Sequence, residues 1–270
     1  MMNISNLSEL GAIIDTACDN SDVEELSTII SSHSEYTETL EDSIEKVYSY
    51  YILGNAWSGI RKILHDTNIN NIWSFQQDEV FKEIYNFRKA KLQKSFEDSN
   101  LEIKIAINVN LANAFSHYGR TINAIKYFNN AIGLKIFNKM VEFHPNFILA
   151  KLNRGKALEY YAKLDYDPNH QFIFIQFAYK AFKETKELLV ICLSQYNQDE
   201  NYYKLIEDDV QNTIINYEKQ WKVQDLENLD TFKNHASKHS ANEKKYRDWC
   251  LQNRLFLNSL NDLGNYQITS

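Results

Sequence analysis

The stretch Leu111-Ala112-Asn113-Ala114-Phe115, followed by Ala124, Phe128 and Ala131, decides the fold of this 270-residue chain. It sets a small residue beside Leu, places an aromatic residue three positions on, and then repeats small and aromatic residues at helical spacing. Related patterns stand before and after it, at Leu53-Gly54-Asn55-Ala56-Trp57 and Gly155-Lys156-Ala157-Leu158. Small side chains let a neighbouring helix approach closely, so these patterns predict helices packed in pairs as hairpins.

This spacing resembles the tetratricopeptide repeat, in which L-[GA]-x2-[YF] and A-x3-F elements lie on the two helices of one hairpin. The corresponding small residues Gly54, Ala112 and Gly155 are 58 and 43 residues apart, which exceeds the ideal period of about 34 residues. The resemblance implies divergent repeats that are lengthened at their loops. We therefore expect an all-α, tetratricopeptide-like solenoid of helical hairpins, with an N-terminal helical pair and a C-terminal helical extension.

The composition supports long helices. Apolar residues make up 44% of the chain and aromatic residues 13%, while only 7 Gly and 2 Pro interrupt it, so disorder and β structure are both disfavoured. No apolar run is long enough to cross a bilayer, and the N-terminus has no signal-peptide pattern. The three cysteines, Cys18, Cys192 and Cys250, are far apart and odd in number, which is typical of a reducing compartment. We expect a cytoplasmic protein with no membrane partner.

We divide the chain into four segments: an acidic N-terminal helical pair at 1–45, a repeat array with a capping helix at 46–227, a linker at 228–242 and a C-terminal helical lead-in at 243–270. Residues 1–45 hold eleven acids and no Lys or Arg, which leaves 25 acids against 29 bases in the rest of the chain. Two interpretations of the acidic head remain open. It folds back to compete with an anionic partner, or it is a solvated hairpin that favours solubility.

The hydrophobic periodicity predicts individual helices and turns. A capped turn is expected at Asn20-Ser21-Asp22, an inter-helix turn at Gly119-Arg120 and a loop at 165–169. Helices are expected over about 44–60 and 80–92, as a pair within about 101–137 on either side of the Gly119-Arg120 turn, after Pro145 up to the loop, and over about 172–193 and 202–221.

Stacked hairpins form a concave surface lined by their first helices, and such a groove holds a peptide or a partner's helix. By repeat register the lining residues are Tyr51, Asn55, Ser58, Val109, Asn113, Ser116, His117, Leu152, Lys156, Glu159 and Tyr160. Asn113 stands where peptide-binding repeats carry an Asn that pairs with ligand backbone. Val109 stands where a Lys is expected in such repeats, which argues against a carboxylate clamp. A protein-interaction scaffold is the leading hypothesis.

A second resemblance covers roughly residues 46–193 and a short C-terminal stretch. The stretches Tyr50–Trp57, Leu111–Phe115 with Gly119-Arg120, Tyr246–Leu251 and Leu255–Leu263 resemble bacterial proteins in which a divergent tetratricopeptide-like array precedes a HEPN-type domain. The resemblance implies a sensing or regulatory module of a toxin or antiviral-defence system. It also implies the alternative function, an RNA-binding or RNA-processing module of a HEPN-type ribonuclease.

The catalytic element of that family is missing from this sequence. HEPN ribonucleases share an Arg-x4-6-His element, whereas Arg61 and His65 have three residues between them and no other Arg is followed by a suitably placed His. We expect the catalytic part to be absent from this chain, and the chain alone not to be an enzyme. His235 and His239 have no carboxylate arranged with them as in a zinc hydrolase motif, and no phosphate loop or dinucleotide motif occurs. We expect no metal and no cofactor.

Cations near aromatic residues keep nucleic-acid binding open, since cations attract phosphate and exposed rings stack on bases. Lys244, Lys245, Arg247 and Arg254 surround Tyr246 and Trp249 near the C-terminus, and Arg88, Lys89, Lys91 and Lys94 cluster on one helix. The alternative is that the rings belong to the core and the cations are solvated. Homo-oligomerisation through 246–263 is a further option.

Overall fold

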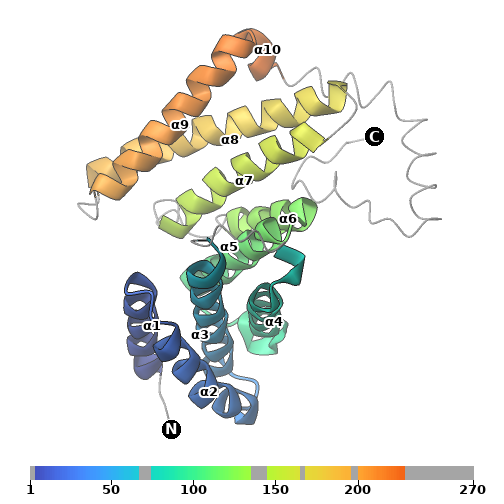
Figure 1. The fold of residues 1–270 in the computed structure, drawn as a ribbon. Coiled ribbons are helices and arrows are strands. Elements are labelled where there is room, and N and C mark those ends of the chain that lie inside the picture. The colour runs from blue at the N-terminus through green and yellow to red at the C-terminus, as the bar shows by residue number, and fades with distance from the viewer. Residues whose placement is uncertain (1–3, 67–73, 135–144, 165–167, 196–199, 229–270) are drawn as a thin grey trace, which may run out of the picture. The chain divides into compact units, whose positions relative to one another are not determined.

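Figure 1 shows a computed structural model of the chain, which describes residues 4–66, 74–134, 145–164, 168–195 and 200–228. Within these ranges the regular structure is entirely helical and contains no strand, which confirms the predicted all-α class. None of the described helices is long and apolar enough to cross a membrane. The chain divides into two compact units, Met1–Arg120 and Thr121–Ser270.

Unit 1 is built around one central helix. Its elements are α1 (Ile4–Asp19), α2 (Val23–Thr39), α3 (Ile44–Arg61), the π-helical turn η1 (Lys62–Asp66), η2 (Ser74–Gln76), α4 (Asp78–Leu92), η3 (Lys94–Phe96) and α5 (Leu101–His117). Helix α3 packs against α1 and α2 as well as against α4 and α5, and Figure 1 shows α1 and α4 on opposite sides of α3. Its buried residues therefore face two sets of neighbours.

Polar side chains set where the helices of unit 1 begin. Asp22 accepts a hydrogen bond from the backbone N–H of Glu25 at 2.9 Å, next to Ser21 at φ 57°, so the predicted capped turn is confirmed. Asn100 caps α5 in the same way through the N–H of Ile103. Asp42 accepts from the backbone N–H groups of Lys94 and Ser95 and from the Ser95 hydroxyl, which ties the α2–α3 connection to η3.

Close contact between α3 and α4 depends on Gly54. A methyl group added at Gly54 would lie 2.5 Å from Cε1 of Phe87 on α4, and the Phe87 side chain is fully buried. Only a residue without a side chain fits between this ring and the α3 backbone. The sequence pattern predicted this close approach at Gly54.

Gly59 allows a similarly close helix contact on the other side of α3. A methyl group there would lie 2.4 Å from Sγ of Cys18 on α1 and 3.1 Å from Leu26 on α2. Cys18 is partly buried against this core, and burial raises the pKa of its thiol. The acidic pair α1–α2 thus packs on the same central helix as α4.

Unit 2 contains α6 (Thr121–Gly133), α7 (Pro145–Leu164), α8 (Pro168–Gln195), α9 (Glu200–Gln220) and α10 (Val223–Glu227). Each of the first three packs on the next, and α10 packs on α8. A methyl group at Gly155 on α7 would lie 2.9 Å from Cε1 of the buried Phe182 on α8, so the glycine–phenylalanine contact of unit 1 recurs here. Helix α8 begins at Pro168, inside the loop predicted at 165–169, because proline is well tolerated in the first turn of a helix. The loop prediction was wrong at that end.

Aromatic contacts hold α9 on α8. The ring of Tyr217 lies 6.1 Å from that of Tyr179 and 6.0 Å from that of Phe182, and the Tyr179 hydroxyl donates to Glu218 at 2.8 Å. The sequence predicted α9 but not α10. Gln176 of α8 donates to the backbone carbonyls of Asp225 and Asn228 and so fixes α10 beside α8.

Candidate functional site

The predicted groove residues of unit 1 make internal polar contacts. On α3, Tyr51 is hydrogen-bonded to Asn55, and Asn55 in turn accepts from the side-chain amide of Asn110 at 2.8 Å. On α5, His117 is hydrogen-bonded through Nε2 to Oε1 of the buried Gln77 at 2.8 Å. These side chains link α3, α4 and α5 to one another, so a ligand at this face would compete with the contacts that hold unit 1 together.

The remaining predicted groove residues differ in accessibility. Val109 and Leu152 are buried, Asn113 is half-buried, and Ser116 and Tyr160 are exposed. In unit 2, Lys156 forms an ion pair with Asp209 at 3.0 Å and Glu159 forms one with Lys163 at 2.9 Å. Within each unit, only some of the predicted groove residues are therefore accessible to a ligand. That they form a ligand surface stays a prediction.

Arg61 and His65, the pair closest to a HEPN spacing, both bind acidic residues of α4. Nε of Arg61 lies 2.8 Å from Oε2 of Glu83, and the two side chains are 6% and 2% exposed. Nε2 of His65, in the π-helical turn η1, lies 2.9 Å from Oε2 of Glu79. Burial raises the pKa of Glu83, while the Arg61 guanidinium and the Ser58 hydroxyl act in the opposite direction. This cluster attaches the end of α3 to α4. Ser58, a predicted groove residue, is hydrogen-bonded to the buried Glu83 carboxylate within it.

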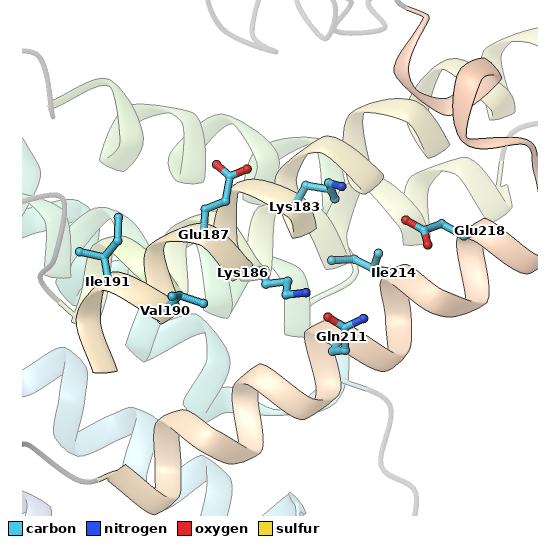
Figure 2. Close-up of a pocket in the computed structure, with 8 residues that line it drawn as sticks. All are labelled: Lys183, Lys186, Glu187, Val190, Ile191, Gln211, Ile214 and Glu218. Atoms are coloured by element: carbon cyan, nitrogen blue, oxygen red, sulfur yellow. The ribbon is translucent and has the colours of Figure 1, made fainter. Parts of the chain in front are cut away.

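A groove of about 650 Å³ lies between α8 and α9. It is lined by Lys183, Lys186, Glu187, Val190 and Ile191 from α8 and by Gln211, Ile214 and Glu218 from α9. Figure 2 shows Lys186, Gln211 and Ile214 directed into the space between the two helices. We call this set of eight residues the α8–α9 groove.

Apolar and charged side chains occupy different parts of the α8–α9 groove, and the charged part holds Glu187 and Glu218 as well as Lys183 and Lys186. Val190 and Ile191 are 51% and 37% exposed on the last turns of α8, whereas Lys183 and Lys186 lie one to two turns earlier. Lys183 is placed by the ring of Tyr179, 5.8 Å from its Nζ. Such an arrangement can accept apolar side chains at one end and a carboxylate at the other.

Sequence reasoning missed this groove because its residues look like the outer face of a capping hairpin. The available signal was Val190-Ile191, two large apolar residues at the end of an otherwise amphipathic helix. The candidate nucleic-acid residues Lys244, Lys245, Arg247 and Arg254 lie outside the described residues, as do His235, His239 and Cys250. Within the described residues no group of three or more His, Cys, Asp or Glu side chains converges as for a metal.

Comparison with known proteins gives no counterpart. No family model, no curated protein and no solved structure matches this chain.

Proposed function

We propose that this chain is a tetratricopeptide-like scaffold and that it binds a partner protein through the α8–α9 groove. The observation that carries the proposal is the exposed Val190-Ile191 pair beside Lys183 and Lys186 in an open groove between two packed helices. The recurring glycine–phenylalanine contact, Gly54 with Phe87 and Gly155 with Phe182, supports a repeat origin for the hairpins. Helical hairpins packed in succession commonly serve as binding scaffolds.

The chemistry of the groove indicates what it would bind. An amphipathic segment of a partner would place apolar side chains against the exposed Val190 and Ile191, and an acidic side chain near Lys183 or Lys186. A compact metabolite fits less well, because small-molecule sites enclose most of the ligand surface. The resemblance noted in the sequence adds the expectation of a regulatory role in a bacterial defence or toxin system, which stays a prediction.

The proposal is tested by a photo-crosslinking amino acid placed at Val190 in the full chain and expressed in its native host. We expect one defined crosslinked partner, and we expect Lys183→Glu with Lys186→Glu to remove it. The same crosslinker at Leu205, which is 70% exposed on α9 but outside the groove, serves as the matched control. The proposal would be contradicted if the crosslinkers at Val190 and Leu205 gave the same crosslinked products, or if the crosslinker at Val190 captured no partner.

Once identified, the partner segment is titrated by calorimetry against wild type and Val190→Asp. Burying a valine side chain contributes about 1.5 kcal/mol, so the variant should bind at least about tenfold more weakly. Unchanged affinity would show that the segment binds elsewhere. Because Val190 is half-exposed in the free protein, the variant should unfold at the wild-type temperature.

A further inference from the structure

The outward side of α4 carries aromatic and basic side chains along its length. Phe81, Tyr85 and Leu92 are 44%, 51% and 73% exposed, and Arg88 is exposed as well. With Lys82 and Lys89 they fall within about one third of the helix circumference at 3.6 residues per turn. We call these six residues the α4 stripe. The opposite side of the helix, which includes Ile84 and Phe87, is buried in unit 1.

Cations and rings are interleaved on this surface. Nζ of Lys89 lies 5.3 Å from the ring centre of Tyr85, so this tyrosine keeps an exposed ring with a cation beside it. The ring of Phe81 meets that of Tyr118 edge-on at 5.1 Å, and the guanidinium of Arg120 lies 5.7 Å from the Tyr118 ring. The surface therefore continues from α4 to the end of α5.

Cations outnumber exposed acids along the α4 stripe. Lys82, Arg88 and Lys89 of the α4 stripe and the adjoining Arg120 provide four cations, and the exposed acid nearest along the helix is Asp78. Glu83, on the same helix, points inward to Arg61. The acid-rich pair α1–α2 also packs on α3, and its exposed Glu38 accepts a hydrogen bond from Tyr50, whose ring lies 6.0 Å from Nζ of Lys89. A polyanion would be attracted to α4 and repelled by α1–α2, which favours one face of the unit.

We propose that the α4 stripe binds single-stranded nucleic acid, with Phe81 and Tyr85 stacking on bases and the four cations contacting phosphates. An unpaired base offers an aromatic face for stacking, and the phosphate next to it carries a negative charge. Half-exposed rings between cations can bind both groups at once. A duplex hides its base faces and would use only the cations. An acidic peptide would likewise use the cations but not the rings. The site is separate from the α8–α9 groove, so its failure would leave the proposed function untouched.

The test is fluorescence anisotropy of the full chain with a labelled single-stranded oligonucleotide of mixed sequence. Duplex of the same sequence and labelled poly-glutamate are titrated in parallel. We expect the single strand to bind most tightly, with a slope of log K against log salt of about −3 for four phosphate contacts. Tyr85→Leu should weaken single-strand binding about tenfold by removing one stacked base, whereas Tyr85→Phe should keep it within about twofold.

The charge dependence needs a control of equal net charge. Arg88→Gln with Lys89→Gln should reduce the salt slope by about half. Lys204→Gln with Lys219→Gln makes the same change at exposed positions of α9 and should leave both slope and affinity as in wild type. Equal losses in the two double variants would overturn the proposal in favour of nonspecific attraction. Binding of poly-glutamate but not of the oligonucleotide, or equal affinity of Tyr85→Leu and Tyr85→Phe, would overturn it as well.

Discussion

Replacing Gly54 with alanine should reverse the usual effect of this substitution in a helix. In a helix interior, alanine is favoured over glycine by about 1 kcal/mol. At Gly54 the new methyl carbon would lie 2.5, 2.6 and 2.8 Å from three ring atoms of Phe87, a side chain that is fully buried. Overpacking of this kind costs about 1 to 3 kcal/mol. Taking the upper end, because three ring atoms clash, gives a net destabilisation of about 2 kcal/mol.

The assay is urea unfolding followed by circular dichroism at 222 nm, with the free energy of unfolding taken at equal m-values. Gly11→Ala is the matched control, because its methyl group would meet only Ile52 at an ordinary 3.5 Å in the interior of α1. It should stabilise the chain by up to about 1 kcal/mol. Gly155→Ala, whose methyl group would lie 2.9 Å from its nearest neighbour, should change the free energy of unfolding by an amount between those of Gly54→Ala and Gly11→Ala.

A second variant separates the clash from other causes. If Phe87 is the obstacle, Gly54→Ala should cost less in a Phe87→Leu background than in wild type, with a coupling of about 1 kcal/mol between the two sites. If Gly54→Ala stabilises the chain as much as Gly11→Ala does, the close packing of α3 on α4 is refuted.

Three further predictions concern polar groups. Arg61→Met alone should cost about 3 to 5 kcal/mol, since it leaves the Glu83 carboxylate buried without its guanidinium, and adding Glu83→Leu should restore much of the loss in urea unfolding; a single variant that costs nothing would contradict the buried ion pair. Hydrogen bonds from the Ser95 hydroxyl and from the N–H groups of Ser95 and Lys94 hold the pKa of Asp42 below its ordinary value of 3.8, so their contribution is present above that pH and is lost as pH falls through the native pKa. The difference in the free energy of unfolding between wild type and Asp42→Asn should accordingly be constant near neutrality and shrink below pH 3.8. A difference that grows in acid would contradict the lowered pKa of Asp42. The buried hydroxyl of Tyr217 has no hydrogen-bond partner within the described ranges, and burial raises its pKa, so Tyr217→Phe should be neutral or stabilising, whereas Tyr179→Phe loses its bond to Glu218 and should cost about 1 kcal/mol.

Local features were predictable from sequence, and long-range ones were not. Asp22 and Gly54 act through neighbours in the chain or through a repeat pattern, so the cap and the close helix contact could be predicted before any coordinates. The contact of Gln176 with Asp225 spans 49 residues, and no periodicity reports such a pairing. The α10 turn was missed for this reason.

The same limit applies to the candidate sites. Lys183, Val190 and Ile214 meet only because α8 and α9 cross, and each alone looks like an ordinary helical surface residue. Arg61 drew attention through its spacing to His65, whereas the structure pairs it with Glu83, 22 residues away. Spacing along a helix identifies which residues share a face, but it does not identify what that face meets.

The Arg61–Glu83 pair also bears on which alignments of α3 and α4 are open to the chain. Sliding α4 by one helical turn, about 5.4 Å, would separate the guanidinium from the carboxylate while both remained in the apolar interior. Each stranded charge would then carry a desolvation penalty of several kcal/mol. The same slip would also move the Phe87 ring off Gly54 and against a residue that has a side chain, so the steric fit disfavours this alignment as well. The pair therefore selects the native alignment mainly by making its competitors costly.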